Sequence, residues 1–177
     1  LLPDQMILQI HESIGHPLEL DRILGDERNY AGLSFIKKEN FGDYQYGSPK
    51  LNITFDPTVE TEAASYSLDD TGAKASKEFI IKEGKLLRGL GSLESQERTN
   101  LKGVACSRMS SWNRPPIDRM ANLNSEPGGA TFDSMVSQMK RGIIMATNKS
   151  WSIDDYRNKF QFGCEYAQLV EDGRPTK

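Results

Sequence analysis

The stretch that decides the fold, residues 5–21, reads QMILQIHESIGHPLELD. Its apolar side chains recur at three- and four-residue spacing, which predicts a helix over residues 5–24. Pro3 suits a first helical turn, whereas Pro17 removes a backbone donor inside the helix. We therefore expect the helix to be kinked, bulged or broken near His16. The apolar positions that carry the spacing are Met6, Ile7, Ile10, Ile14, Leu18 and Ile23.

The only two histidines of the chain, His11 and His16, lie in the segment HESIGH. On a regular helix, residues five apart point about 140° away from each other, so their side chains do not share a face. A widened π-type turn takes up about one extra residue and brings both imidazoles to one face. Gly15 loosens the backbone and Pro17 lacks the N–H that would bond to residue 13. Both residues favour such a turn at this place.

Converging imidazoles beside a carboxylate are the ligands and the base that zinc-dependent hydrolysis requires. Imidazole nitrogens bind the metal, and a nearby carboxylate accepts a proton from the attacking water. The pattern therefore marks His11 and His16 as candidate zinc ligands and Glu12 as a candidate general base. Two histidines near one another on a helix are also commonly just solvated or hydrogen-bonded, with the glutamate at the surface. Spacing alone leaves both interpretations open.

Length and composition describe one soluble, rather polar domain, residues 1–177. The chain is 37% hydrophobic and 27% charged, with a formal net charge of -3. This balance argues against a large nucleic-acid footprint, and no apolar run approaches the roughly 20 residues that cross a bilayer. Cys106 and Cys164 form no C-x-x-C pair, which favours reduced thiols in a cytoplasmic protein. Neither end reads as a natural terminus, so we expect part of a longer polypeptide.

Beyond the motif, the pattern predicts an α+β fold with a mostly antiparallel sheet and one short later helix. The segment KLNITFD at 50–56 alternates like a strand. ASYSL and EFIIKEGKLLRGL are expected to form hairpins, with turns at DDTG and at 83–84. Residues 91–130 read mainly as loops. A helix is expected over 131–141, and strands over 143–147 and 158–170, followed by a turn at 172–173.

HESIGHPLELD resembles the HExxxH stretch of the TldD/PmbA family, whose catalytic members carry H-E-x-x-G-H-x-L-E. The segment YSLDDTGAKASKEFIIKEGKLLRGL is similar to the turn–strand–turn–strand segment of that family, and FQFGCEYAQLVEDGRPTK resembles the strand and hairpin that follow. In order and rough spacing, the resemblance covers most of the chain. Between these segments the matching positions are Arg108, Pro116, Arg119, Met120, Asn122, Pro127 and Gly128.

The resemblance implies a cytoplasmic Zn²⁺ peptidase that acts on unfolded or extended polypeptides. It implies His11 and His16 as metal ligands, Glu12 as the base, and a paralogous PmbA-type subunit or a second copy as partner. The family's third ligand is a cysteine in a later C-G-K-like segment that is absent from this sequence, and we do not transfer that role to Cys106 or Cys164. This departure keeps an alternative open, a non-catalytic binding or regulatory module with an incomplete metal site.

Four further side chains are weaker candidates. Glu19 and Asp21 follow His16 by about one turn and could orient an imidazole from outside the ligand set. Arg108 and Arg119 could bind a substrate carboxylate or an oxyanion, although arginines in polar loops are more often structural anchors.

Overall fold

The motif helix is widened at its centre and broken at its end, as the sequence predicts. In this computed structural model, which describes residues 1–176, a regular helix passes into a π-helical turn and then a short 3₁₀ turn. Glu19 is extended, with φ -65° and ψ 120°, and it separates the 3₁₀ turn from the next helix. Gly25 ends that helix in the left-handed conformation, φ 90°. The elements are α1 (Pro3–Ile10), η1 (His11–Gly15), η2 (His16–Leu18) and α2 (Leu20–Leu24).

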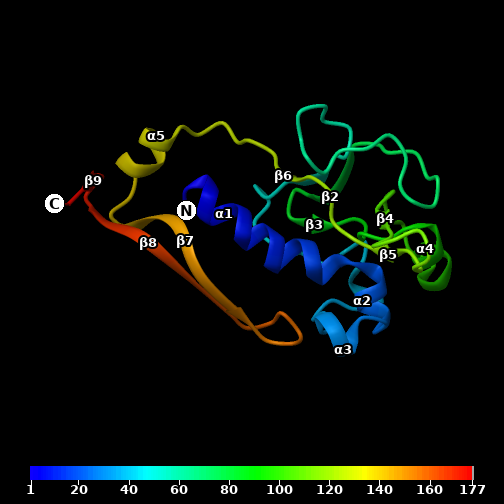
Figure 1. Ribbon diagram of the computed structural model, residues 1–177. Coiled ribbons are helices and arrows are strands. Elements are labelled where there is room, and N and C mark those ends of the chain that lie inside the picture. Colours follow the sequence, from blue (N-terminus) through cyan, green and yellow to red (C-terminus); the bar gives the residue numbers. More distant parts are fainter. Residues whose placement is uncertain (177) are drawn as a thin grey trace.

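A four-stranded antiparallel sheet packs against this broken helix (Figure 1). Its strand order is β3-β2-β1-β6, and the predicted turn at 83–84 joins β2 to β3. The core between helix and sheet is formed by Ile10, Ile14 and Leu18 on one side and by Ile53, Phe55, Ile80 and Ile81 on the other. The strands are β1 (Ile53–Phe55), β2 (Glu78–Lys82), β3 (Lys85–Leu86) and β6 (Leu123–Ser125).

The expected strand ASYSL, residues 64–68, is wrong. Among the described residues this segment forms one isolated bridge, between Leu68 and Lys74. Its other hydrogen bonds go to several different segments, because Tyr66 N–H donates to Pro57 O and the Tyr66 hydroxyl donates to Ala105 O. Across the DDTG turn, Ala75 N–H donates to Ser67 O at 3.0 Å and Asp69 N–H donates to Ala73 O at 2.9 Å. This pairing is too short to form a strand.

The later helices also differ from expectation. The expected 131–141 helix is the shorter α5 (Phe132–Ser137), whose first turn is capped by the Thr131 hydroxyl accepting from Ser134 N–H at 3.2 Å. A further helix, α4 (Leu93–Thr99), was not predicted because small polar residues, Ser95 and Thr99, form its buried face. The remaining short elements are α3 (Arg28–Ala31), η3 (Lys38–Asn40), β4 (Ser107–Arg108) and β5 (Ile117–Asp118).

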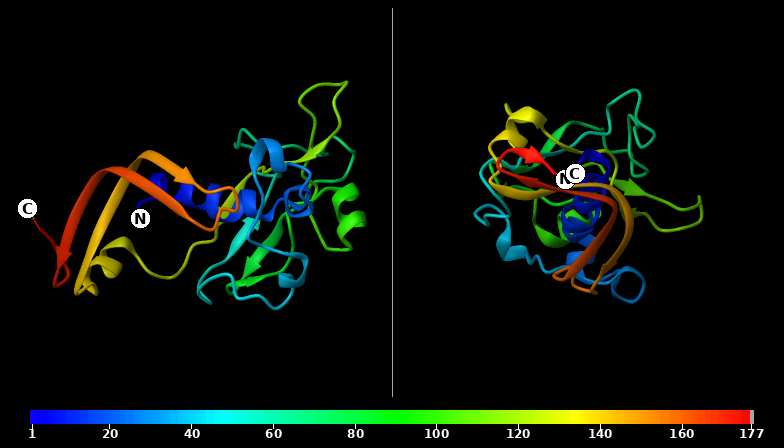
Figure 2. Two further views of the ribbon diagram at one scale, coloured as in Figure 1. Left: turned by 90° about the horizontal axis from the view of Figure 1, so that it is seen from below. Right: turned by 90° about the vertical axis from the view of Figure 1, so that its left-hand side faces the viewer.

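Residues 141–171 form a long hairpin that lies alongside the motif helix (Figures 1 and 2). Its first strand extends well beyond the expected 143–147, whereas its second strand agrees with the expected 158–170 to within two residues. Near the start of the chain, Leu2 N–H donates to Met145 O at 2.9 Å, and the hairpin tip reaches the segment after α3. No helix within residues 1–176 is both long enough and apolar enough to cross a membrane. The strands are β7 (Arg141–Ile153), β8 (Phe160–Glu171) and β9 (Arg174–Pro175).

Candidate metal centre

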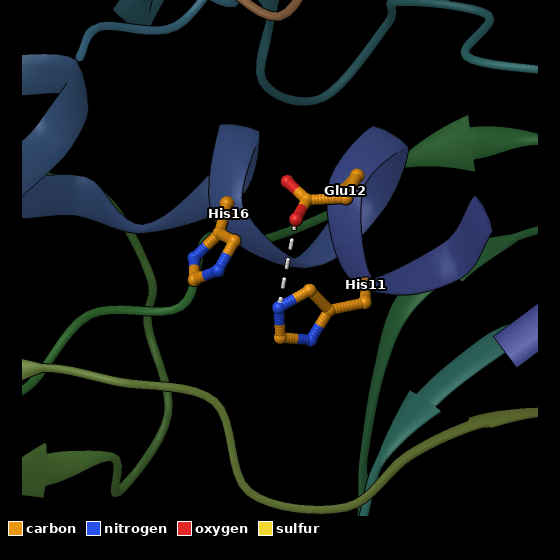
Figure 3. A group of neighbouring side chains, drawn as sticks. All are labelled: His11, Glu12 and His16. Carbon is orange, nitrogen blue, oxygen red and sulfur yellow. Dashed lines mark ion pairs between the residues drawn. The ribbon is translucent and has the colours of Figure 1, made fainter. Parts of the chain in front are cut away.

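The π-helical turn brings the two imidazoles together. The backbone N–H of His16 bonds to His11 O, five residues earlier, so the helix is one residue wider here than a regular turn. The ring centroids of His11 and His16 lie 4.4 Å apart, with the rings inclined at 81° (Figure 3). The widening that the sequence predicts therefore places residues i and i+5 on the same face.

Three features, two of them local, allow this turn. A Cβ on Gly15 would lie 1.9 Å from the Met120 sulfur, so any larger residue here would require the Met120 side chain to move. Pro17 has no N–H for the carbonyl of Ser13, and the Tyr46 hydroxyl donates to that carbonyl instead. Burial and the neighbouring Tyr44 raise the pKa of Tyr46 well above its usual value, so this hydroxyl remains a donor.

Glu12 lies beside both imidazoles. One potential ligand atom from each of His11, Glu12 and His16 lies within 4.8 Å of the others, and Glu12 Oε1 is 3.9 Å from His11 Nε2. The His11 side chain is 46% exposed, whereas those of His16 and Glu12 are 20% and 8% exposed. Burial, and then the proximity of His16, lower the pKa of His11, which favours the neutral imidazole that metal binding requires.

The orientation of His16 is fixed by a buried ion pair. Its Nδ1 lies 3.0 Å from Glu19 Oε2, and the same oxygen accepts from Arg22 Nη2 at 2.6 Å. Arg22 Nη2 lies farther from the same ring nitrogen, at 3.3 Å. The shorter contact, to a carboxylate that only accepts, favours the tautomer with its proton on Nδ1 and with Nε2 free to act as a ligand. Burial opposes ionisation of Glu19, but the hydrogen bond and charge of His16, followed by Arg22, outweigh it and lower its pKa. Glu19 thus holds the position that the sequence suggested for it.

Asp21 lies away from the histidines. Its backbone N–H donates to Asp118 Oδ2 at 3.0 Å, and Asp118 N–H donates back to Asp21 Oδ2 at 3.1 Å. Burial, and then the negative charges of Asp118 and Glu19, raise the pKa of Asp21 to about 7. These reciprocal bonds tie α2 to β5, so the structure gives Asp21 an anchoring position rather than one that orients an imidazole.

The two candidate arginines differ in surroundings. Arg119 donates to Glu27 Oε2 at 3.1 Å, and its Nη1 lies 4.0 Å from Glu19 Oε2, behind the imidazole. Arg108 is exposed, and together with Arg119 it lines an open cavity of about 520 Å³. This places Arg119 within the charged surroundings of the centre and Arg108 at the surface.

The cysteines are not part of the centre. Cys106 is 1% exposed within the apolar core, where burial raises the pKa of its thiol well above the usual value. Cys164 lies on β8. In the part of the chain that the structure describes, the group of side chains that could hold a metal ion consists of His11, Glu12 and His16.

One residue at the centre had no signal in the sequence. Arg157, at the tip of the β7–β8 hairpin, places its Nε 3.9 Å from Glu12 Oε2. The tip segment DDYRNK reads as an ordinary turn, and only the path of the hairpin brings it to the motif helix.

Beside His11 there is a small cavity of about 160 Å³, most of whose lining residues are apolar. It borders β6, which is an edge strand of the four-stranded sheet formed by the described residues. An edge strand offers free backbone groups to an extended chain, and the cavity offers space for one apolar side chain. The lining residues are Ile7, Ile10, His11, Met120, Ala121 and Leu123.

Comparison with known proteins gives a consistent result. The sequence model of the PmbA/TldA metallopeptidase C-terminal domain matches residues 2–177. The chain is 30% identical over 168 residues to a metalloprotease of Methanocaldococcus jannaschii, covering 95% of this chain and 35% of that protein. It is 30% identical over 171 residues to the metalloprotease TldD homolog of Haemophilus influenzae, covering 95% of this chain and 33% of that protein. The chain thus spans about one third of these relatives.

Solved structures show the same fold. A proposed modulator of DNA gyrase from Thermotoga maritima superposes with a TM-score of 0.80 at 18% identity, covering 98% of this chain and 37% of that one. TldE from Thermococcus kodakarensis gives a TM-score of 0.74 at 15% identity, covering 96% and 37%. With the match to the domain model over nearly its whole length, the chain belongs to the PmbA/TldD metallopeptidase family.

Proposed function

We propose that this chain forms the zinc-binding and base-carrying part of a peptidase that hydrolyses extended polypeptides. The observation that carries the proposal is the π-helical turn, which brings His11 and His16 within 4.4 Å between ring centroids, with Glu12 beside them. Membership of a metallopeptidase family supports the reaction class.

The chemical type of the donor atoms, imidazole nitrogens, suits a zinc ion. Two imidazoles converge, His16 is oriented by a carboxylate in the manner usual for metal-binding histidines, and the lowered pKa of His11 favours its neutral form. Catalytic zinc commonly has three protein ligands, and residues 1–176 bring only two imidazoles together. We therefore propose that a third ligand comes from outside these residues.

Each side chain has a separate task in this proposal. His11 and His16 would hold the ion, which when bound supplies a Lewis acid beside the scissile carbonyl. Glu12 accepts the proton of the attacking water and passes it to the leaving amine. Glu19 keeps the His16 proton on Nδ1. The low exposure of Glu12 keeps bulk water away from the base, so its hydrogen bonds are made with reacting groups.

The edge strand β6 and the cavity beside His11 support an extended peptide as substrate. Backbone pairing with β6 would place a peptide alongside the centre without reading its sequence, and one side chain would enter the cavity. A PmbA-type subunit or a second copy as partner rests on the family resemblance. The native mass of the intact protein, alone and with such a subunit, tests that part.

Metal analysis combined with peptide cleavage by the intact protein tests the function. We expect stoichiometric zinc, strongly reduced in His11→Ala and in His16→Ala. Glu12→Gln should keep the metal and lose cleavage, whereas Glu165→Gln, which changes an exposed carboxylate on β8, should keep both. Metal-free wild-type protein would contradict the zinc site. Zinc without cleavage of any extended peptide would favour the binding or regulatory module instead.

A further inference from the structure

Arg157 is buried although it lies at a hairpin tip. Its side chain is 8% exposed, and its Nε lies 3.9 Å from Glu12 Oε2, in a side chain that is also 8% exposed. Neither of these two buried atoms has a hydrogen-bond partner among residues 1–176. A long, charged side chain at a tip usually extends into water, so its inward position needs a physical cause.

The tip itself is built to turn this residue inward. The Asp154 carboxylate accepts from the backbone N–H groups of Asn158 and Lys159 at 2.8 and 3.1 Å, and Arg157 N–H donates to Asp154 O at 2.9 Å. Within this tight loop Arg157 has φ 57°, in the left-handed region that a non-glycine residue seldom adopts. The loop conformation therefore aims the side chain back toward α1 and η1.

The segment after α3 holds the tip in place. Leu33 N–H donates to Asp155 O at 2.6 Å, and Arg157 Nη1 donates to Leu33 O at 3.1 Å. A Cβ on Gly32 would lie 2.6 Å from Asp155 O, so the two segments are in close contact. Figure 2 shows the hairpin tip close to the middle of the motif helix in a second view. Arg157 is thus fixed at both its backbone and its guanidinium.

The charges around Arg157 make Glu12 its natural counter-ion. Burial, and then repulsion from Arg22, lower the pKa of Arg157, but a guanidinium stays charged at neutral pH. A buried cation beside another cation is unfavourable unless an anion lies near it. Three carboxylates oppose this lowering of the pKa, Glu12 first and then Glu19 and Asp155. Glu19 is already paired with Arg22 at 2.6 Å, and Glu12 is the carboxylate whose oxygen lies 3.9 Å from the Arg157 Nε.

The two oxygens of Glu12 therefore face different groups. Oε1 lies 3.9 Å from His11 Nε2, and Oε2 lies 3.9 Å from Arg157 Nε. We propose that Arg157 is a positioning residue for Glu12: it holds Oε2, so that Oε1 remains directed at the reacting groups beside the imidazoles. The catalytic part of this inference rests on the proposed peptidase function, whereas the pairing of the two side chains does not.

A double-mutant cycle in the metal-free intact protein tests the pairing. The unfolding equilibrium constant is measured for wild type, Glu12→Gln, Arg157→Gln and the double variant. We expect the two single effects to be non-additive by about tenfold in that constant. Lys159→Gln, which removes an exposed cation two residues away, should be additive with Glu12→Gln. Additive effects of Arg157→Gln and Glu12→Gln would overturn the pairing.

Kinetics of the zinc-loaded intact protein test the positioning. Arg157→Gln should lower kcat about 10- to 100-fold with unchanged zinc content and little change in KM, and Arg157→Lys should recover part of the loss. Lys159→Gln should behave like wild type. If wild type cleaves peptides and Arg157→Gln cleaves them equally well, the inference fails while the proposed function stands. If wild type cleaves nothing but the cycle is non-additive, the proposed function fails and the ion pair stands.

Discussion

The hydroxyl of Tyr46 donates to the carbonyl of Ser13, the carbonyl for which Pro17 provides no N–H. A residue from outside the helix thus completes the backbone hydrogen bonding of the π-helical turn that brings the imidazoles together. The widened turn is therefore held by tertiary structure as well as by its own sequence, and this dependence can be measured.

Tyr46→Phe should destabilise the protein by about 1–3 kcal/mol, because it leaves a carbonyl without its donor in a partly buried place. It should also weaken zinc binding if the turn loses its shape. Urea denaturation and zinc titration of the intact protein measure both effects. Tyr44→Phe is the matched control, because Tyr44 is 38% exposed and packs edge-on against Tyr46. Equal stabilities of the two variants would contradict the role assigned to this hydroxyl.

Glu19→Gln should weaken zinc binding about 10- to 100-fold, since an amide orients His16 less strongly than a carboxylate. It should also cost about 3–5 kcal/mol of stability, because Arg22 is left buried without its counter-ion. Zinc titration at a temperature where both proteins are folded separates the two effects.

Glu97→Gln provides the control for that substitution, since Glu97 is an exposed residue of α4. It should change neither quantity. An unaltered zinc affinity in Glu19→Gln would show that the buried carboxylate does not orient the imidazole.

Asp21→Asn should alter the pH dependence of stability. The folded state raises the pKa of Asp21 from 3.8 to about 7, so between these values it binds more protons than the unfolded state. Below about pH 4, Asp21 makes its full contribution to the free energy of unfolding. This contribution is lost as the pH rises toward 7, at up to about 1.4 kcal/mol per pH unit. The lowered pKa of His11 acts in the opposite direction, its contribution being lost as the pH falls below 6.5.

The difference between wild type and Asp21→Asn isolates the aspartate. Urea denaturation from pH 4.5 to 8 should show the variant gaining stability relative to wild type as the pH rises. Asp43→Asn changes an exposed carboxylate and should follow the wild-type curve. Parallel curves for wild type and Asp21→Asn would contradict the raised pKa.

The features of the site that depend on neighbouring residues could be predicted from the sequence, whereas the contacts from distant segments could not. Gly15 and Pro17 predict a widened turn because the loosened backbone and the missing N–H affect only residues close to them in the sequence. Tyr46 and Arg157 contact Ser13 and Glu12 from distant segments. The sequence patterns of those segments do not predict these contacts. Glu19 was suggested as a partner of His16 because it follows by about one turn, and the structure places its carboxylate 3.0 Å from the His16 Nδ1.

The secondary structure likewise divides into elements that the sequence predicts and elements that it does not. The paired strands with strong alternation and clear turns were predicted, including the turn at 83–84. Helix α4 was missed because Ser95 and Thr99 fill its buried face, where a pattern of apolar residues would otherwise mark a helix. The segment 64–68 was misjudged because alternation marks a strand only when another strand lies beside it.

The β7–β8 hairpin also sets the order in which the centre is assembled during synthesis. Thr147 N–H bonds to Asp4 across 143 residues of sequence, and Arg157 bonds to Leu33 across 124. Contacts between segments so far apart form late and slow the folding of a chain. HESIGH leaves the ribosome near the beginning of this segment, whereas the arginine that faces its glutamate follows near the end. Glu12 therefore meets Arg157 only after the hairpin has been synthesised and has folded back onto the motif helix.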